Sequence, residues 1–314
     1  MIKIRFSFYG GAREVGKSSI LAEHDKYSVM MDCGVKLGGE TVKYPQQPPK
    51  LDSFILSHAH LDHSGAVPAL YKKFKAPMYA TDISFELSHL LQRDLVKIND
   101  MKGLGSPYTL PDIDAMKSLE KDSDYNTSYT LNDNLSFKLY DAGHIPGSAS
   151  ILLETDTMKV LYTGDIKLSD TCLLKGCETT PKADVIITES TYGNRRHPPR
   201  KEMEKDFIDR VEETLARGGT ALIPAFAVGR SQEMLMVLAD INYPIYLDGM
   251  GQDMTRLFLQ YPKYLKDPDL LRKAASRSQW IKHRGDRRKA IREPAIIITT
   301  AGMLDGGPAV HYIS

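Results

Sequence analysis

The 314-residue sequence is long enough for two average domains, each with a buried core of its own. Hydrophobic residues make up 42% and charged residues 26%, ordinary globular values that exclude a disordered or fibrous chain. Because 41 Lys and Arg nearly balance 40 Asp and Glu, the net charge is +1, and a polyanion would need a local basic patch.

Neither a membrane protein nor a disulfide-stabilised secreted protein is indicated. No apolar run reaches the roughly 18 residues that cross a bilayer. The N-terminus lacks the apolar region of a signal peptide. Three cysteines are too few for a disulfide framework. We therefore expect a reduced, cytoplasmic enzyme without a membrane partner.

Short strands and a few helices are predicted for the first half of the chain. A helical pattern runs from Ser64 to Phe74, and a longer one from Ile83 to Asp100 places leucines at helical spacing. Alternating or β-rich patterns predict strands at residues 2–6, 18–23, 27–32, 53–57, 135–140, 149–155 and 158–165.

Strands and helices alternate after about residue 183, which is typical of a parallel α/β layer. Strands are expected at 183–190, 220–226 and 294–302, and helices at 201–217 and 229–239. A polar segment with two prolines, GNRRHPPR, separates the two patterns. We therefore predict an α/β fold with one domain at 1–185 and a second at 186–314.

The most informative motif is His58-Ala59-His60-Leu61-Asp62-His63, directly after a predicted strand. On a helix, side chains two positions apart point about 200° away from each other, so His-x-His suits a loop or a strand end. Imidazoles and a carboxylate this close together form a nitrogen and oxygen ligand set that suits zinc. Histidines with a purely structural role are the alternative.

Two further segments supply the same kinds of group at the ends of predicted strands, Asp141–His144 and Tyr162–Asp165. Gly-His and Gly-Asp are also common turns. Together with the histidine motif, however, they would place His144 and Asp165 at a shared sheet edge, with Asp165 able to bridge two metals. Asp32 also ends a strand, and it either orients a ligand histidine or starts a turn.

Such a site has the charge and the chemistry for a phosphodiester. Two zinc ions with Asp62, Asp165 and a bridging hydroxide would leave a net charge of about +1. Metal coordination lowers the pKa of water towards about 7, so hydrolysis would need no serine or cysteine nucleophile.

These residues resemble the metallo-β-lactamase superfamily, with HAHLDH as its histidine motif and His144 and Asp165 as the later ligands. The resemblance implies an αββα sandwich with the site at one edge of two facing sheets. It also implies two zinc sites, with His58, His60 and His144 as ligands of one, Asp62 and His63 as ligands of the other, and Asp165 between them.

The second half resembles the β-CASP nucleases, which include RNase J and the endonuclease of the cleavage and polyadenylation specificity factor. The resemblance covers essentially the whole chain and is greatest to archaeal cleavage-factor-like and RNase J-like proteins. It implies a metallo-β-lactamase domain at 1–185 followed by a β-CASP domain at 186–314. The segments that carry it are Gly10–Gly16, Thr188–Gly193, Pro224–Glu233, Tyr246–Met250 and Thr300–Leu304. In this family Glu189 is tied to the catalytic centre, in proton handling or in orientation.

Candidate RNA-binding residues come from the same half. Gly229, Arg230 and Ser231 are predicted to open a helix whose free N–H groups face a phosphate, with Arg230 adding a charge-assisted hydrogen bond. An ordinary turn with a serine N-cap is the alternative. Small residues around Gly302 offer a second place where a nucleic-acid backbone could approach closely.

The one dense basic tract runs from Arg272 to Arg292, with nine basic residues and one acid. Trp280 and Arg284 lie within it. Such a tract could bind RNA phosphates and stack a base, or it could be a solvated helix face.

The family pattern continues beyond the last residue of this sequence. Expected histidines in a Ser-Ala-His-like and a Val-His-Gly-like phrase do not occur, and the last one would complete the second zinc site. His311 fits neither phrase. We therefore expect a C-terminally truncated relative that lacks the segment returning to the first domain, with a full first zinc site, a depleted second site and reduced nuclease activity.

The predicted function is that of a zinc-dependent ribonuclease that hydrolyses single-stranded RNA with metal-activated hydroxide. It would cut as an endonuclease, with or without 5′-to-3′ exonuclease action, in RNA processing or decay, alone, as a homodimer or within an RNA-processing complex. The catalytic candidates are Asp32, Asp165 and Glu189. A non-catalytic RNA-binding subunit of a cleavage-factor-like complex and a thioesterase-type metallo-hydrolase are the alternatives. The thioesterase would need neither Glu189 nor the second domain.

Overall fold

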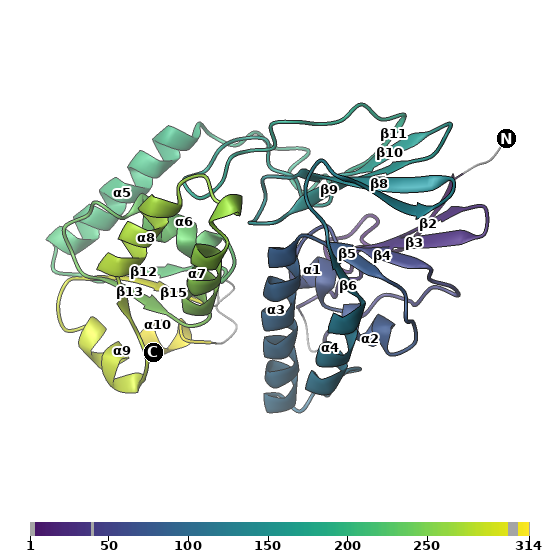
Figure 1. Cartoon of the computed structure of the whole chain (residues 1–314). Helices are drawn as coiled ribbons and strands as arrows, with labels where there is room; N and C mark the ends of the chain where they lie inside the picture. The colour runs from purple at the N-terminus through teal and green to yellow at the C-terminus, as the bar shows by residue number, and fades with distance from the viewer. Residues whose placement is uncertain (1–3, 39–40, 301–306, 314) are drawn as a thin grey trace. The chain divides into compact units, whose positions relative to one another are not determined.

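The computed structural model describes residues 4–38, 41–300 and 307–313, which belong to two compact units (Figure 1). The first unit comprises Met1–Ser169 and Gly176–Thr191, and the second comprises Asp170–Lys175 and Tyr192–Ser314. The chain therefore passes between the units three times. The domain division between residues 185 and 186 stays a prediction.

Two β-sheets form the centre of the first unit, one with six strands in the order β1-β2-β3-β4-β5-β6 and one with five in the order β11-β10-β9-β8-β7. Pairing is antiparallel from β1 to β3 and from β7 to β10, and parallel from β3 to β6 and between β10 and β11. The strands of the first sheet are β1 (Ile4–Gly10), β2 (Ser19–His24), β3 (Tyr27–Met31), β4 (Ser53–Ile55), β5 (Met78–Ala80) and β6 (Glu120–Asp122). Those of the second are β7 (Ser128–Asn132), β8 (Leu135–Asp141), β9 (Ala149–Glu154), β10 (Lys159–Tyr162) and β11 (Val185–Ile187).

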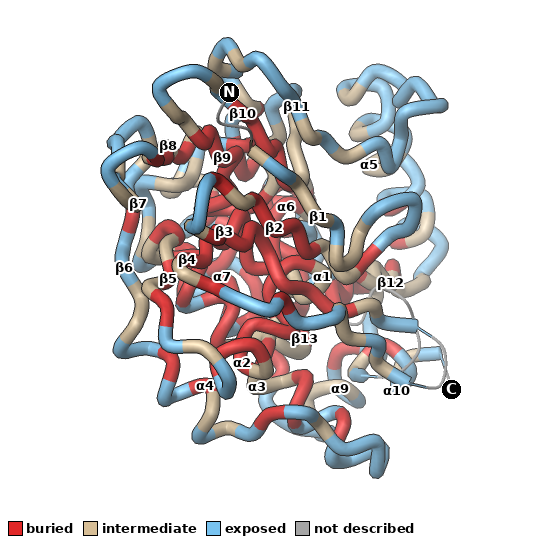
Figure 2. Tube along the Cα trace, turned by 90° about the vertical axis from the view of Figure 1, so that its right-hand side faces the viewer, coloured by how far each residue is buried: buried red, intermediate tan, exposed pale blue. Residues whose placement is uncertain are grey.

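Alternation along β2 shows how these sheets pack. Ile20 and Ala22 share a core cluster with Leu139 and Ile151 of the second sheet, whereas Leu21 belongs to a cluster with helix side chains. Successive side chains of a strand point to opposite faces. The first sheet therefore faces the second sheet on one side and a helical layer on the other, and its inner strands are largely buried (Figure 2). The helices of this unit are α1 (Leu61–Ser64), α2 (Val67–Tyr71), α3 (Asp82–Met101), α4 (Leu110–Met116) and the 3-10 helix η1 (Lys117–Leu119).

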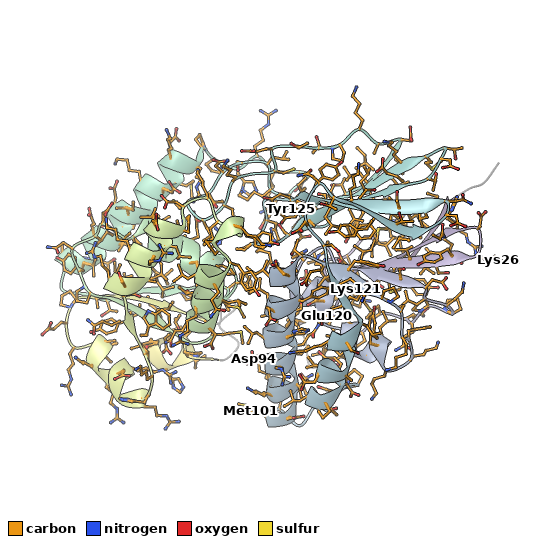
Figure 3. The ribbon with its side chains drawn as sticks, in the orientation of Figure 1. Lys26, Asp94, Met101, Glu120, Lys121 and Tyr125 are labelled. Atoms are coloured by element: carbon orange, nitrogen blue, oxygen red, sulfur yellow. The ribbon has the colours of Figure 1, made fainter. Side chains whose placement is uncertain are left out.

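A part-buried polar contact joins the helical layer to the edge of the first sheet. Glu120, labelled in Figure 3, begins β6, and its carboxylate lies 2.7 Å from His89 Nε2 of α3. Within the described parts of the chain, no helix combines the length and the apolar character needed to cross a lipid bilayer.

A four-stranded parallel sheet in the order β12-β15-β13-β14 forms the second unit. Its strands are β12 (Ala221–Pro224), β13 (Ile245–Asp248), β14 (Gln279–Trp280) and β15 (Ile296–Thr299). Ile296 and Ile298 pack in one cluster and Ile297 in another, so both faces are covered, as parallel sheets require. The helices are α5 (Arg200–Ala216), α6 (Arg230–Val237), α7 (Gly251–Gln260), η2 (Pro262–Tyr264), α8 (Pro268–Arg277), α9 (Arg284–Ala290) and α10 (Val310–Ile313).

These elements confirm the predicted α/β class, the two facing sheets and the parallel layer of the second half. The predicted helix over 64–74 is confirmed in part by α2. Its start and its continuity are wrong, because α1 starts inside the histidine motif and ends before Gly65, and α2 starts anew with Pro68 in its first turn. α4 and the strands β5 to β7 are not predicted from the sequence, and of these β5 and β6 have only three residues each and show little periodicity. The predicted strands at 2–6 and 294–302 extend into residues outside the described ranges.

Residues 170–175, which we call the anchored segment, pack in the second unit although first-unit residues flank them. The carboxylate of Glu233 on α6, only 3% exposed, accepts the N–H groups of Cys172 at 2.9 Å and Leu173 at 2.8 Å, and it pairs with Arg200. These contacts fix the segment to α5 and α6.

Glu233→Gln is expected to loosen the anchored segment, because the amide keeps the size of the side chain and loses the charge that Arg200 and two N–H groups share. A hydrogen bond to a charged group contributes about 1.5–3 kcal/mol, so amide exchange at Cys172 and Leu173 should become at least about tenfold faster. Hydrogen exchange measures this, with Glu212→Gln on the exposed side of α5 as control. Unchanged exchange in the Glu233 variant would show that other contacts hold the segment.

Candidate metal centre

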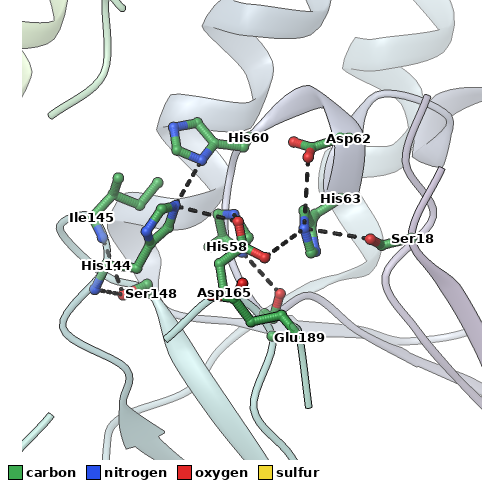
Figure 4. A network of polar contacts seen from close by, with 12 residues as sticks. Ser18, His58, His60, Asp62, His63, His144, Ile145, Ser148, Asp165 and Glu189 are labelled. Atoms are coloured by element: carbon green, nitrogen blue, oxygen red, sulfur yellow. Dashed lines mark hydrogen bonds and ion pairs between the residues drawn. The ribbon is translucent and has the colours of Figure 1, made fainter. Parts of the chain in front are cut away.

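Six side chains predicted as metal ligands come together in the first unit (Figure 4). They form two groups that share Asp165, and within each group the ligand atoms all lie within 4.8 Å of one another. One group consists of His58, His60, His144 and Asp165, and the other of Asp62, His63 and Asp165. The histidines and the aspartate of the first group lie in the loops that follow β4, β8 and β10. Asp62 and His63 of the second group lie on α1.

The two carboxylate oxygens of Asp165 face different groups. Oδ2 lies 3.8 Å from His58 Nε2 and 3.5 Å from His144 Nε2, whereas Oδ1 lies 3.3 Å from His63 Nε2. His144 Nε2 is also 3.0 Å from His60 Nδ1. This is the arrangement of a carboxylate that bridges two cations.

The first group fits a metal ion for a reason internal to the structure. His58 Nε2 is buried and has no hydrogen-bond partner among the described residues. Burial, together with the neighbouring imidazoles of His63, His144 and His60, holds the pKa of His58 well below its usual value. A buried neutral imidazole with an unshared lone pair costs free energy unless something accepts that pair. A divalent cation does so.

Asp165 stays ionised in this surrounding. Burial alone would raise the pKa of its carboxyl group, but the hydrogen bond and charge of His63 and the charges of His144 and His60 outweigh burial and lower the pKa to about 2. The anionic form is the one that binds cations.

Asp32 lies beneath the site and orients His63. It is fully buried, with φ at +59°, and His63 Nδ1 lies 2.6 Å from its Oδ2. Oδ1 accepts the Ser57 N–H, and Oδ2 accepts the hydroxyls of Ser57 and Tyr162, each at 2.7 Å. The contact with a ligand histidine is the one expected from the sequence, while its part in catalysis stays a prediction. Sequence reasoning missed Ser57 and Tyr162, because single hydroxyl residues at strand ends carry no spacing signal.

Close backbone packing holds α1, which carries Asp62 and His63. The Ser18 N–H donates to Asp62 O at 2.8 Å, and the Cys33 N–H donates to His63 O at 2.7 Å. A Cβ at Gly34 would lie 1.6 Å from Asp62 O, so only glycine fits there. The helix is thereby fixed against the loops that follow β1 and β3.

Ser148 shapes the loop that carries His144. Its hydroxyl accepts the N–H groups of His144 at 3.0 Å and Ile145 at 3.3 Å. Its carbonyl oxygen accepts the hydroxyl of Tyr125 at 2.7 Å, a residue labelled in Figure 3. Neither Ser148 nor Tyr125 stands out in the sequence, because each acts through single hydrogen bonds that carry no spacing signal.

Glu189 belongs to the first unit and lies beside the centre (Figure 4). Its Oε1 is 3.4 Å from the N–H of Ile166, the residue after Asp165, and its Oε2 is 3.2 Å from the N–H of Thr191. A role in proton handling stays a prediction.

One expectation about the RNA-binding candidates of the second unit is corrected. Gly229 N–H donates to Gln232 Oε1, Arg230 N–H to Val228 O, and the N–H of buried Ser231 to Phe226 O. The expectation of free N–H groups at this helix start is therefore wrong, although the Arg230 side chain is exposed. Gly302 lies outside the described residues.

Some side chains of the basic tract, residues 272–292, form contacts within the protein. Arg287 pairs with Asp248 at 2.7 Å. The guanidinium of Arg256 lies 4.5 Å from the centre of the Trp280 ring and covers one face of it, so that face is not free for a base. Arg284, at the start of α9, is exposed.

Two family models match the chain. The model described as Anti-Pycsar protein Apyc1 matches residues 10–205, and the model described as Beta-Casp domain matches residues 231–314. The first match contains every side chain of the metal centre.

Curated archaeal proteins are similar over nearly the whole chain. Probable RNase MJ4 of Methanocaldococcus jannaschii is 45% identical over 320 residues, which cover 98% of this chain and 74% of that protein. RNase aCSPSF2 of Saccharolobus solfataricus is 39% identical, and the match covers 96% of this chain and 62% of that protein. A crystal structure of a protein of unknown function from Enterococcus faecalis V583 shares the fold, with a TM-score of 0.58 at 12% identity over 96% of this chain and 78% of that one.

Asp32→Asn is expected to weaken metal binding at the group that contains His63, because an amide no longer holds the imidazole as a charged acceptor. Loss of such an outer partner typically costs about 10–100-fold in metal affinity. Zinc titration of the two proteins measures it, with Asp133→Asn in an exposed turn as control. A folded Asp32 variant with unchanged zinc affinity would contradict the role given to this carboxylate.

The two ligand groups should differ in affinity, because four described side chains form one and three form the other. His144→Ala should then weaken only the tighter site, Asp62→Asn only the weaker one, and Asp165→Asn both. Stepwise chelation with metal analysis resolves the two classes. A single class of sites in the unmodified protein would rule this out.

Proposed function

The chain belongs to the β-CASP family of metallo-β-lactamase-fold nucleases, and on this basis we propose that it is a metal-dependent ribonuclease acting on single-stranded RNA in RNA processing. Residues 10–205 also belong to the family whose model is described as Anti-Pycsar protein Apyc1. The chain spans 74% and 62% of the length of the two archaeal relatives, whose names contain RNase.

One observation carries the proposal, namely the two ligand groups joined by Asp165. Paired cations held this way are suited to phosphodiester hydrolysis, because bound divalent metals acidify water and neutralise charge on the phosphoryl oxygens. Imidazole nitrogens with carboxylate oxygens favour zinc among the common metals. We take zinc as the resident ion for that reason.

The chain's own residues would divide the remaining work. Asp32 keeps His63 in one orientation through the 2.6 Å contact. Glu189, which contacts the Ile166 N–H next to Asp165, would accept the proton of the attacking water and return it to the leaving 3′ oxygen. In-line attack then leaves 5′-phosphate and 3′-hydroxyl ends.

RNA contacts are assigned to exposed cations of the second unit. Arg230 and Arg284 are exposed and would bind phosphates. Gly229 and Ser231 would shape the turn that carries Arg230, since their N–H groups are used internally. All three cysteines are free thiols, which fits the reducing cytoplasm.

The test is cleavage of end-labelled single-stranded RNA in the presence of zinc, with a thioester substrate alongside. The unmodified chain should cut RNA and leave the thioester intact. His60→Ala should cleave RNA at least about 10–100-fold more slowly. Loss of a residue that only orients a metal ligand typically costs that much, and here a ligand itself is removed.

His311→Ala, on the exposed side of α10, serves as the matched control and should retain activity. Hydrolysis of the thioester without cleavage of RNA would contradict the ribonuclease function and indicate a thioesterase. RNA binding without cleavage by zinc-loaded protein would leave only a binding subunit.

A further inference from the structure

Phe226 stands out in the second unit as an aromatic side chain that is 58% exposed, in the loop between β12 and α6. Single apolar residues on a protein surface are common and by themselves indicate nothing. Three further observations, on the rigidity of the loop, its place on the sheet and the charge beside it, distinguish this residue.

The loop is rigid. Phe226 O accepts the N–H of Ser231 at 3.1 Å and its hydroxyl at 2.8 Å. The Gln232 side chain donates to Ala227 O at 3.1 Å and accepts the Gly229 N–H at 2.9 Å. Ser231 and Gln232 are fully buried. Buried polar groups thus fix the backbone at Phe226 and directly after it while its ring stays exposed, so a ligand on the ring would find it already ordered.

The loop lies at the carboxyl edge of the parallel sheet. Pro224, the last residue of β12, pairs with Thr299 of β15, and Asp248, the last residue of β13, pairs with the same Thr299. The strands therefore end together, and the loop after β12 begins at that edge. Ligands of open α/β sheets bind outside the carboxyl ends of the strands.

A cation follows Phe226 closely in the sequence. Arg230, four residues after Phe226, is exposed, and its guanidinium has no hydrogen-bond or ion-pair partner among the described residues. The nearby acids are already engaged, because Glu233 accepts Arg200 and two N–H groups, and Asp248 accepts Arg287 and Tyr312. An exposed aromatic ring with a free cation suits a nucleotide, which offers a flat base and an anionic phosphate.

We propose that Phe226 and Arg230 form a nucleotide-binding site in which a base of single-stranded RNA stacks on the Phe226 ring and an adjacent phosphate contacts Arg230. The proposal rests on the ribonuclease function and adds to it a contact that reads the flat face of a base. A stacking contact favours single strands, whose bases are accessible, over duplexes, and it tolerates every base.

The test measures binding of the full chain, carrying His60→Ala to prevent cleavage, to a fluorescent single-stranded RNA and to the same strand without bases. Phe226→Ala should weaken binding to RNA by about tenfold and leave binding to the abasic strand unchanged. Phe226→Trp should retain RNA affinity. Tyr243→Ala, an exposed aromatic residue of the same unit, is the matched control.

Arg230→Gln should weaken binding to both strands and reduce the salt dependence of the binding constant by about one phosphate contact. Arg217→Gln, at the exposed end of α5, is its control. Phe226→Ala binding that equals the Tyr243→Ala value, or that falls equally for the abasic strand, would overturn the stacking site. A change of oligomeric state in Phe226→Ala with RNA affinity retained would assign the ring to a protein interface instead.

Failure of this site and failure of the ribonuclease function give different results. If the chain with its metal ligands intact cleaves RNA and Phe226→Ala binds it normally, only the stacking site is lost. If the intact chain neither binds nor cleaves RNA, the proposed ribonuclease function itself is wrong. Circular dichroism and thermal unfolding of each variant show that a loss of binding comes from the side chain and not from misfolding.

Discussion

Asp165 presents one carboxylate oxygen to each of two imidazole groups, and much of the first unit serves to keep this geometry. Without a cation, His58 Nε2 is a buried acceptor with no donor among the described residues. A fold can hold such an atom only if other contacts offset its cost or a ligand completes it. The facing sheets, whose cluster includes Ile55 and Tyr162 at the ends of β4 and β10, offset that cost locally.

The same residues belong to both the core and the site. The Tyr162 ring packs between the two sheets, while its hydroxyl reaches Asp32 at 2.7 Å. Asp32 directly follows β3 with a left-handed φ of +59°, a conformation that costs a non-glycine residue free energy and is found where the surroundings enforce it. The position of the Asp32 carboxylate is therefore set by the sheet. The hydrogen bond to this carboxylate then fixes the orientation of the His63 ring.

Sequence reasoning could locate the metal ligands because they lie in a six-residue motif and at two strand ends, where residue type and spacing both carry information. It could not locate Ser57, Ser148 or Tyr125, whose roles come from individual hydrogen bonds that leave no pattern in the sequence. The helix start at Arg230 was predicted, but the free N–H groups were not found, because Gln232 folds back onto the Gly229 N–H. The strands β5 and β6 are too short for their periodicity to be visible.

Polar groups at strand ends are stabilised differently in the two units. In the first, charged and ionisable side chains are gathered at strand ends and need cations to become compatible with burial. In the second, Ser231 and Gln232 form hydrogen bonds with backbone groups of Phe226, Ala227 and Gly229, which order the strand-end loop without a ligand. The Phe226 ring and the Arg230 side chain stay exposed on this loop and at the helix start. A rigid loop whose remaining exposed groups are an aromatic face and a positive charge loses little entropy when a nucleotide binds.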